Sequence, residues 1–103
     1  MKNIFDAIPG NIESEIFERL VDNENIRIER IISRGHSSPE SGWYDQDRNE
    51  WVMVLKGAAT LSFAEAVSVT LKTGDFIDIP AHKKHRVDWT DPSTETIWLA
   101  VHY

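Results

Sequence analysis

Residues 50–57 read EWVMVLKG. The run WVMVL is apolar throughout, which is typical of a buried strand, and Gly57 ends it. The strand nevertheless begins with a carboxylate, Glu50. Alternation along a strand places Glu50 on the same face as Val52 and Val54. Because a lone carboxylate is costly to bury unless it is paired or bound to a metal, we expect Glu50 to face a polar site. An ion pair with Arg30, Arg34 or Arg86, or a place at the solvated rim, is the alternative.

Short runs of alternating apolar and polar residues follow on both sides of this stretch, separated by turn residues such as Thr73–Gly74–Asp75 and TDPST at 90–94. This pattern predicts an all-β sandwich or small barrel. Strands do not alternate with helices, which argues against a parallel sheet of the nucleotide-binding kind. The expected strands are 26–33, 50–56, 59–63, 67–71, 76–79, 85–89 and 96–103.

One helix is expected, at residues 11–23, which read NIESEIFERLVDN. Ile12, Ile16 and Leu20 recur at helical spacing, and Asn11 is a suitable N-cap residue. The sequence therefore predicts a short N-terminal helix packed outside the barrel.

Composition narrows the possible functions. The chain has 103 residues, a formal charge of −6 and no cysteine. An acidic chain is a poor general binder of nucleic acid or anionic membrane, so neither is expected as a partner. The absence of cysteine excludes disulfides, thiolate metal sites and a cysteine nucleophile. The N-terminal residues lack the apolar core of a signal peptide, and no apolar run is long enough to span a bilayer. We expect a cytoplasmic protein.

Two spacings carry a family resemblance. Glu50 and Gly57 bracket six residues, and Gly74 is followed by DFIDI, Pro80 and, five residues further on, His85. Together they resemble the two motifs of the cupin superfamily, in particular small single-domain bacterial cupins. The resemblance implies a jelly-roll β-barrel with a ligand cavity. We therefore expect a single domain over 1–103, with a helical segment at 1–24 and the barrel at 25–103. It also implies a homodimer, which would cover an apolar strand face.

In many cupins, two histidines and the glutamate of the first motif bind one divalent metal together with the histidine of the second. Here only Glu50 and His85 match. The two histidine positions fall on Tyr44 and Gln46, or on Trp43 and Asp45, depending on the spacer. Imidazole, carboxylate and amide groups can hold Zn, Fe, Mn or Ni.

The resemblance and this chemistry together predict a metal site of Gln46, Glu50 and His85, with His36 as fourth ligand or general base. Tyr44 is expected to act on or wall an organic ligand. The remaining histidines are assigned lesser roles, His82 in a turn and His102 in a structural hydrogen bond.

Two functional interpretations stay open. The first is a metal-binding cupin that acts on a small organic molecule, with oxygenase, isomerase or decarboxylase chemistry, as the resemblance implies. The second is a non-catalytic cupin, either structural or binding a small molecule, whose metal site is weakened or lost. The missing histidines of the first motif keep both open, because fold alone does not choose between them.

Overall fold

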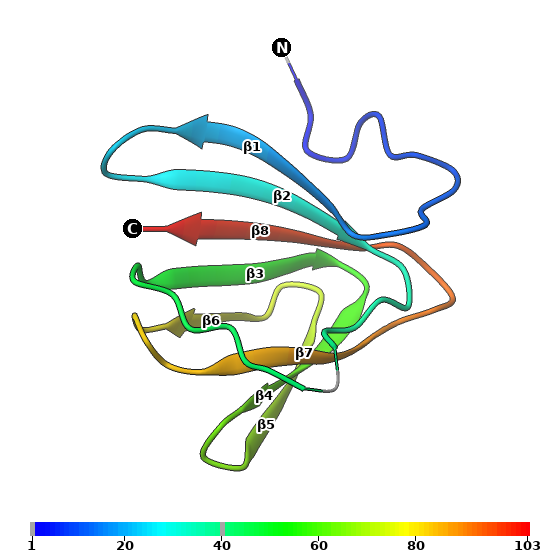
Figure 1. Ribbon diagram of the computed structural model, residues 1–103. Helices are drawn as coiled ribbons and strands as arrows, with labels where there is room; N and C mark the ends of the chain where they lie inside the picture. The colour runs from blue at the N-terminus through cyan, green and yellow to red at the C-terminus, as the bar shows by residue number, and fades with distance from the viewer. Residues whose placement is uncertain (1, 40) are drawn as a thin grey trace.

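The computed structural model describes residues 2–39 and 41–103, and within them the chain forms two antiparallel sheets that face each other (Figure 1). The first sheet has the strand order β1-β2-β8-β3-β6, and the second has the order β5-β4-β7. The strands are β1 (Ile16–Asp22), β2 (Arg27–Ser33), β3 (Glu50–Lys56), β4 (Ala58–Phe63), β5 (Val67–Lys72), β6 (Phe76–Ile79), β7 (His85–Thr90) and β8 (Thr96–His102). The all-β prediction is confirmed.

Strand β3 has the two faces that its alternation predicts. Glu50, Val52 and Val54 are buried, whereas Trp51 and Met53 are partly exposed on the opposite face. Neighbouring strands continue the inner face, so that apolar side chains from both sheets meet in one core. The core is made by Ile31, Val52, Val54, Ala59, Leu61, Phe63, Leu71, Ile79, Trp98 and Ala100.

The predicted N-terminal helix is wrong. Residues 16–22 form β1, which pairs with β2 in the register Phe17 with Ile31 and Glu18 with Arg30. No helix lies within residues 2–39 or 41–103. The segment can also be read with period two, and its β-branched and aromatic residues favour strands. Pairing with β2 satisfies one edge of β1 through backbone hydrogen bonds, a tertiary gain that outweighs the weak helical preference. No membrane-spanning helix is found in the part of the chain described.

Gly57 carries the chain from one sheet to the other, as the single residue between β3 and β4. Its φ of +89° is a conformation that other residues rarely adopt. A Cβ at this position would lie 2.5 Å from Oγ1 of Thr96 and 2.8 Å from the Thr96 Cα. The backbones of two strands therefore approach so closely here that only glycine fits.

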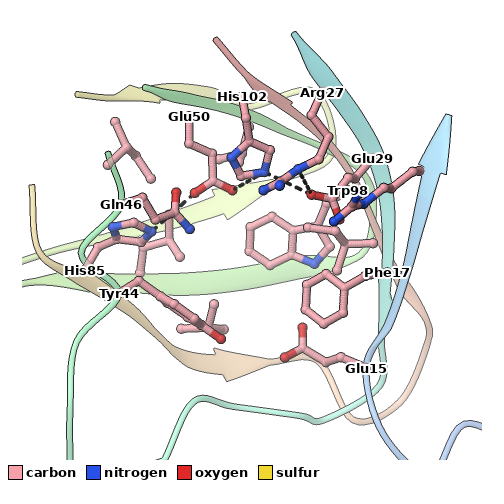
Figure 2. Close-up of a pocket in the computed structure, with 16 residues that line it drawn as sticks. Glu15, Phe17, Arg27, Glu29, Tyr44, Gln46, Glu50, His85, Trp98 and His102 are labelled. Carbon is pink, nitrogen blue, oxygen red and sulfur yellow. Dashed lines mark ion pairs between the residues drawn. The ribbon is translucent and has the colours of Figure 1, made fainter. Parts of the chain in front are cut away.

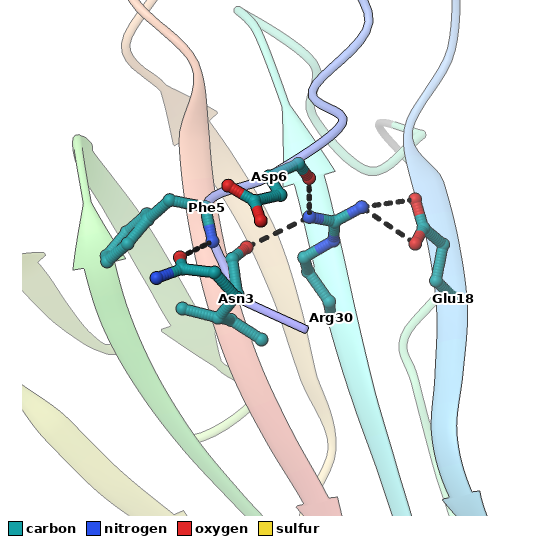
Figure 3. A network of polar contacts seen from close by, with 6 residues as sticks. Asn3, Phe5, Asp6, Glu18 and Arg30 are labelled. Atoms are coloured by element: carbon teal, nitrogen blue, oxygen red, sulfur yellow. Dashed lines mark hydrogen bonds and ion pairs between the residues drawn. The ribbon is translucent and has the colours of Figure 1, made fainter. Parts of the chain in front are cut away.

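Arg30 lies on the outer face of the first sheet and ties the N-terminal segment to it (Figure 3). Its guanidinium donates to both carboxylate oxygens of Glu18, at 2.9 and 2.8 Å, and to the backbone carbonyls of Ile4 and Asp6, at 2.9 and 2.6 Å. Because Arg30 faces away from Glu50, the alternative of an ion pair between them is excluded. The polar groups that do meet Glu50 lie on the inner face.

Candidate functional site

A cavity of about 260 Å³ lies between the inner faces of the two sheets (Figure 2). Its wall is part charged and part apolar. It is lined by Glu15, Phe17, Arg19, Arg27, Glu29, Ile31, Tyr44, Gln46, Glu50, Val52, Leu61, Ile79, His85, Val87, Trp98 and His102. Three of the four predicted metal ligands, and Tyr44, are therefore in one cavity.

Strand register places a row of polar side chains across the first sheet. Arg27 of β2, His102 of β8 and Glu50 of β3 are directly opposite one another. The His102 Nε2 atom lies 3.8 Å from Oε2 of Glu50 and 3.2 Å from Oε1 of Glu29. Glu29 in turn pairs with Arg27 at 2.8 Å. Charged and ionisable groups thus form a continuous line along one wall of the cavity.

His85, on β7 of the second sheet, contacts the Glu50 end of this row. Its Nε2 lies 3.4 Å from Oε1 of Glu50, and its Nδ1 lies 2.9 Å from the backbone carbonyl of Lys83. Because a carbonyl can only accept, Nδ1 carries a proton and donates it there. In the neutral ring the lone pair of Nε2 then faces Glu50. This is the arrangement in which a second partner fixes the tautomer of a histidine that binds a metal.

The two histidines differ in how readily they bind a proton. Burial lowers the pKa of His85, but the hydrogen bond and negative charge of Glu50, together with the Lys83 carbonyl, outweigh it and raise the pKa above its ordinary value. Burial also dominates at His102, where the Glu50 charge opposes it and the Arg27 guanidinium adds to it, so the pKa of His102 is lowered. Glu50 therefore lies between a histidine that favours the charged form and one that favours the neutral form.

The loop before β3 holds Gln46 at the cavity through backbone and side-chain contacts with the turn before β7. The His82 backbone N–H donates to the Gln46 carbonyl at 2.7 Å, and Nδ1 of His82 lies 2.8 Å from a carboxylate oxygen of Asp45. Tyr44 and His85 exchange two backbone hydrogen bonds, at 2.8 and 3.1 Å. His82 adopts a φ of 63°, a conformation that residues other than glycine rarely adopt, in the turn that contacts this loop. Two chain segments far apart in sequence thus position Gln46.

Tyr44 and His36 differ in their relation to the cavity. The Tyr44 ring lies 5.7 Å from the His85 ring, and Tyr44 lines the cavity. His36 is not among the residues that line the cavity. Its Nδ1 accepts from the Arg34 backbone N–H at 2.9 Å, and its Nε2 lies 3.1 Å from the Glu13 carbonyl. The structure therefore does not bring His36 to Glu50 and His85.

Several residues of the cavity were missed by sequence reasoning, above all Glu29, Arg27 and Trp98, and His102 was given only a structural role. Alternation along residues 26–33 does place Arg27 and Glu29 on one face with Ile31. That signal could have marked them as inward-facing. Which strands stand beside β2 is not visible in its own sequence, so their meeting with His102 and Glu50 could not be inferred.

The residues present can be tested against a metal ion. Within the described ranges, no group of three or more His, Cys, Asp or Glu side chains is arranged to hold one. A centre in this cavity therefore needs an amide ligand beside Glu50 and His85. The Oε1 atom of Gln46 is buried and lacks a hydrogen-bond partner among the described residues. Imidazole, carboxylate and amide groups are ligand types that suit borderline and hard divalent ions.

A closed pair of antiparallel sheets around a polar cavity defines the jelly-roll class of β-barrels. The chain belongs to the cupin family: the cupin domain matches residues 31–102, which include both motifs and the strands that carry Glu50, His85 and His102. A comparison with curated proteins found no match.

Solved structures show the same fold. The chain is 42% identical to a Ralstonia eutropha JMP134 protein called "putative mannose-6-phosphate isomerase", with 99% of this chain and 95% of that chain covered and a TM-score of 0.94. An RmlC-like cupin with a double-stranded β-helix fold from Methanocaldococcus jannaschii is 19% identical, covering 92% and 84%, with a TM-score of 0.72. A Thermus thermophilus protein is 15% identical, covering 99% and 94%, with a TM-score of 0.80.

Proposed function

We propose that this cupin binds a divalent metal, Zn, Fe, Mn or Ni, through His85, Glu50 and Gln46, and receives a small organic molecule in the cavity beside it. The observation that carries the proposal is the unpartnered Oε1 of Gln46 in the same cavity as the Glu50–His85 pair. An acceptor without a donor, next to a carboxylate and an imidazole lone pair, is what a cation would satisfy. His102, which lies beside Glu50, takes the role of general base that His36 was expected to fill.

The polar line along the cavity wall is suited to move protons as well as to hold a cation. When bound, a divalent metal supplies Lewis-acid polarisation of a ligand oxygen. His102, whose lowered pKa keeps its ring neutral, can accept a proton from a ligand in the cavity. Arg27 fixes Glu29, which holds His102 from the other side. Tyr44 walls the ligand beside His85.

Among the reaction classes implied by the family, isomerisation is favoured. The similarity to the Ralstonia eutropha protein points to this class. Isomerisation by proton transfer needs an acid or a base that faces the substrate, and His102, whose pKa is lowered by burial, is a neutral ring in this cavity. The chemistry is thus consistent with what the similarity suggests.

Metal analysis of protein made without a polyhistidine tag tests this proposal. We expect close to one equivalent of metal, as purified or after addition of Zn, Fe, Mn or Ni. His85→Ala and Gln46→Ala should each lower the affinity at least tenfold. Glu24→Gln, which changes an exposed residue in the turn between β1 and β2, is the matched control and should bind metal as the parent does. A parent protein that holds no metal and takes up none would refute the centre.

A second candidate is a metal-free binding protein. It is favoured by the internal pairing of charges in the cavity, where Glu50 meets His85 and Glu29 meets Arg27. Under this proposal the same cavity holds the ligand without turnover, and His85 stays protonated against Glu50. Ligand binding that is unchanged by chelators would support it.

Assembly and location complete the proposal. A homodimer would cover the outer face of the first sheet, where Trp51 and Phe76 lie with ring centroids 5.4 Å apart and Phe76 is 62% exposed. We place the protein in the cytoplasm, in keeping with the composition of the chain.

A further inference from the structure

The indole N–H of Trp98 is a buried donor in the wall of the cavity. Trp98 is 3% exposed, and no acceptor for its Nε1 is found in the described part of the chain. It lies on β8 four residues before His102, so the two Cα atoms are about 13 Å apart along the strand. Buried indole N–H groups are normally hydrogen-bonded. A donor left free at the wall of a cavity indicates an acceptor on the molecule that enters.

Gln46 presents the complementary group. Its Oε1 is a buried acceptor in the same cavity. Two residues that line the cavity thus each hold a buried polar atom without a partner in the described part of the chain, a donor on the first sheet and an acceptor on the loop before β3. Hydroxyl groups can both donate and accept, so a ligand with several hydroxyls can satisfy either position. If a metal occupies Gln46, the requirement at Trp98 remains.

The charges of the cavity disfavour a phosphorylated ligand. Its described lining holds the carboxylates of Glu15, Glu29 and Glu50 and no lysine. The guanidinium of Arg27 is paired with Glu29 at 2.8 Å, and that of Arg19 is paired with Asp22 at 2.6 Å. In the metal-free cavity a phosphate dianion would therefore meet three carboxylates, while Arg27 is already paired with Glu29 and Arg19 lies in an exposed ion pair with Asp22.

The size and apolar surface of the cavity indicate a ligand of monosaccharide size. About 260 Å³ is near the lower end of organic ligand sites, which begin at about 300 Å³. Phe17, Tyr44 and Val87 line the same cavity as the polar row, so a ligand with both C–H and hydroxyl faces finds both kinds of wall.

We propose that the cavity selects an uncharged polyhydroxylated molecule, such as an unphosphorylated sugar, and that the Trp98 indole N–H donates to one of its oxygens. This inference rests on the cavity of the proposed function and does not require the metal. It separates this chain from the phosphorylated substrate in the name of the Ralstonia eutropha protein. Trp98 is thereby assigned as a residue that determines specificity.

The test uses two pairs of probes: D-mannose with D-mannose 6-phosphate, and D-fructose with D-fructose 6-phosphate. Each is titrated into ¹⁵N-labelled protein while the indole N–H signals are followed by NMR. We expect a free sugar to shift the Trp98 signal and to bind at least tenfold more tightly than its phosphate. Trp98→Phe, which keeps the ring shape and removes the donor, identifies the signal and should weaken sugar binding about fivefold to tenfold. Trp51→Phe, on the outer face, is the matched control and should bind as the parent does.

Three results would overturn the inference: tighter binding of a phosphate ester than of its free sugar, no binding by either sugar, or a sugar that binds without moving the Trp98 signal. The signal in the parent protein decides the question even if Trp98→Phe fails to fold. Metal content measured on the same samples separates the two proposals. Bound metal without sugar binding refutes this inference alone, and sugar binding without metal refutes the metal centre alone.

Discussion

The Nε2 atom of His85 and the Oε1 atom of Glu50 lie 3.4 Å apart although the two residues belong to different sheets. Glu50 begins β3 and His85 begins β7, so the contact joins the sheets at one end of the cavity. Both side chains are nearly buried. A buried carboxylate needs a partner, and the two motifs supply it from strands that are distant in sequence. This contact accounts for the carboxylate at the start of an otherwise apolar strand.

Proton binding at the two histidines around Glu50 should move in opposite directions. In metal-free protein, we expect His85 to titrate above the ordinary value of 6.5 and His102 below it. The raised pKa of His85 stabilises the fold fully below about pH 6.5, and this contribution is lost as the pH rises through the pKa of the folded state. The lowered pKa of His102 gives a contribution that is full above about pH 6.5 and is lost as the pH falls through its folded value.

Imidazole proton shifts followed by NMR between pH 4 and pH 9 would measure both values, with His85→Gln and His102→Gln used to assign the signals. Titration of both histidines on the same side of 6.5 would contradict the account of the Glu50 pairings.

Substitution of His36 and of His102 should affect metal binding differently. Because the ring of His36 contacts only backbone groups of Arg34 and Glu13 among the described contacts, His36→Ala should leave metal affinity within about twofold of the parent. His102→Ala removes a ring that lies beside Glu50 and Glu29 and should lower affinity about tenfold or more. Calorimetric titration with Zn or Mn measures both. Equal losses of metal affinity in the two variants would show that His36 contributes to the site as much as His102 does.

The sequence predicts most of the strands of this protein, because period-two alternation is a local property. The strands expected at 50–56 and 76–79 are found with the same bounds, and the others differ by one residue at an end. The N-terminal segment fails because its pattern is compatible with both periods, and only the free edge of β2 decides between them. Such a decision depends on tertiary contacts that a short window does not contain.

Some residues of the candidate site can likewise be predicted from the sequence, and others depend on tertiary structure. Motif spacing is enough to single out Glu50 and His85, and the structure places Gln46 with them. His102 and Glu29 join the site only because β8 lies between β2 and β3, an order that no local pattern reveals. The sequence allows the loop that carries His36 to fold over the cavity. In the structure the His36 ring instead contacts the backbone of Arg34 and Glu13.

The predicted homodimer can be tested at the outer face of the first sheet. Trp51 and Phe76 present a partly exposed apolar surface there, and a patch of this kind is typical of a subunit interface. Phe76→Asp should convert a dimer to a monomer, as measured by sedimentation velocity, with the fold kept by circular dichroism. Val67→Asp, at an exposed position on β5 of the other sheet, is the matched control. A parent protein that sediments as a monomer at high concentration would contradict the prediction.

Gly57→Ala should destabilise the barrel more than any surface change. The added Cβ would lie 2.5 Å from Oγ1 of Thr96 and 2.9 Å from the Glu95 carbonyl, and the φ of +89° would itself be strained. We expect a loss of roughly 2–5 kcal/mol in the free energy of unfolding, measured by urea denaturation. Gly74→Ala is the matched control, because Gly74 has a similar φ of +90° but open space around its Cβ position. It should lose only the conformational part, about 1–3 kcal/mol. Equal losses in the two variants would show that the close approach of β3 and β8 at Gly57 contributes nothing beyond backbone strain.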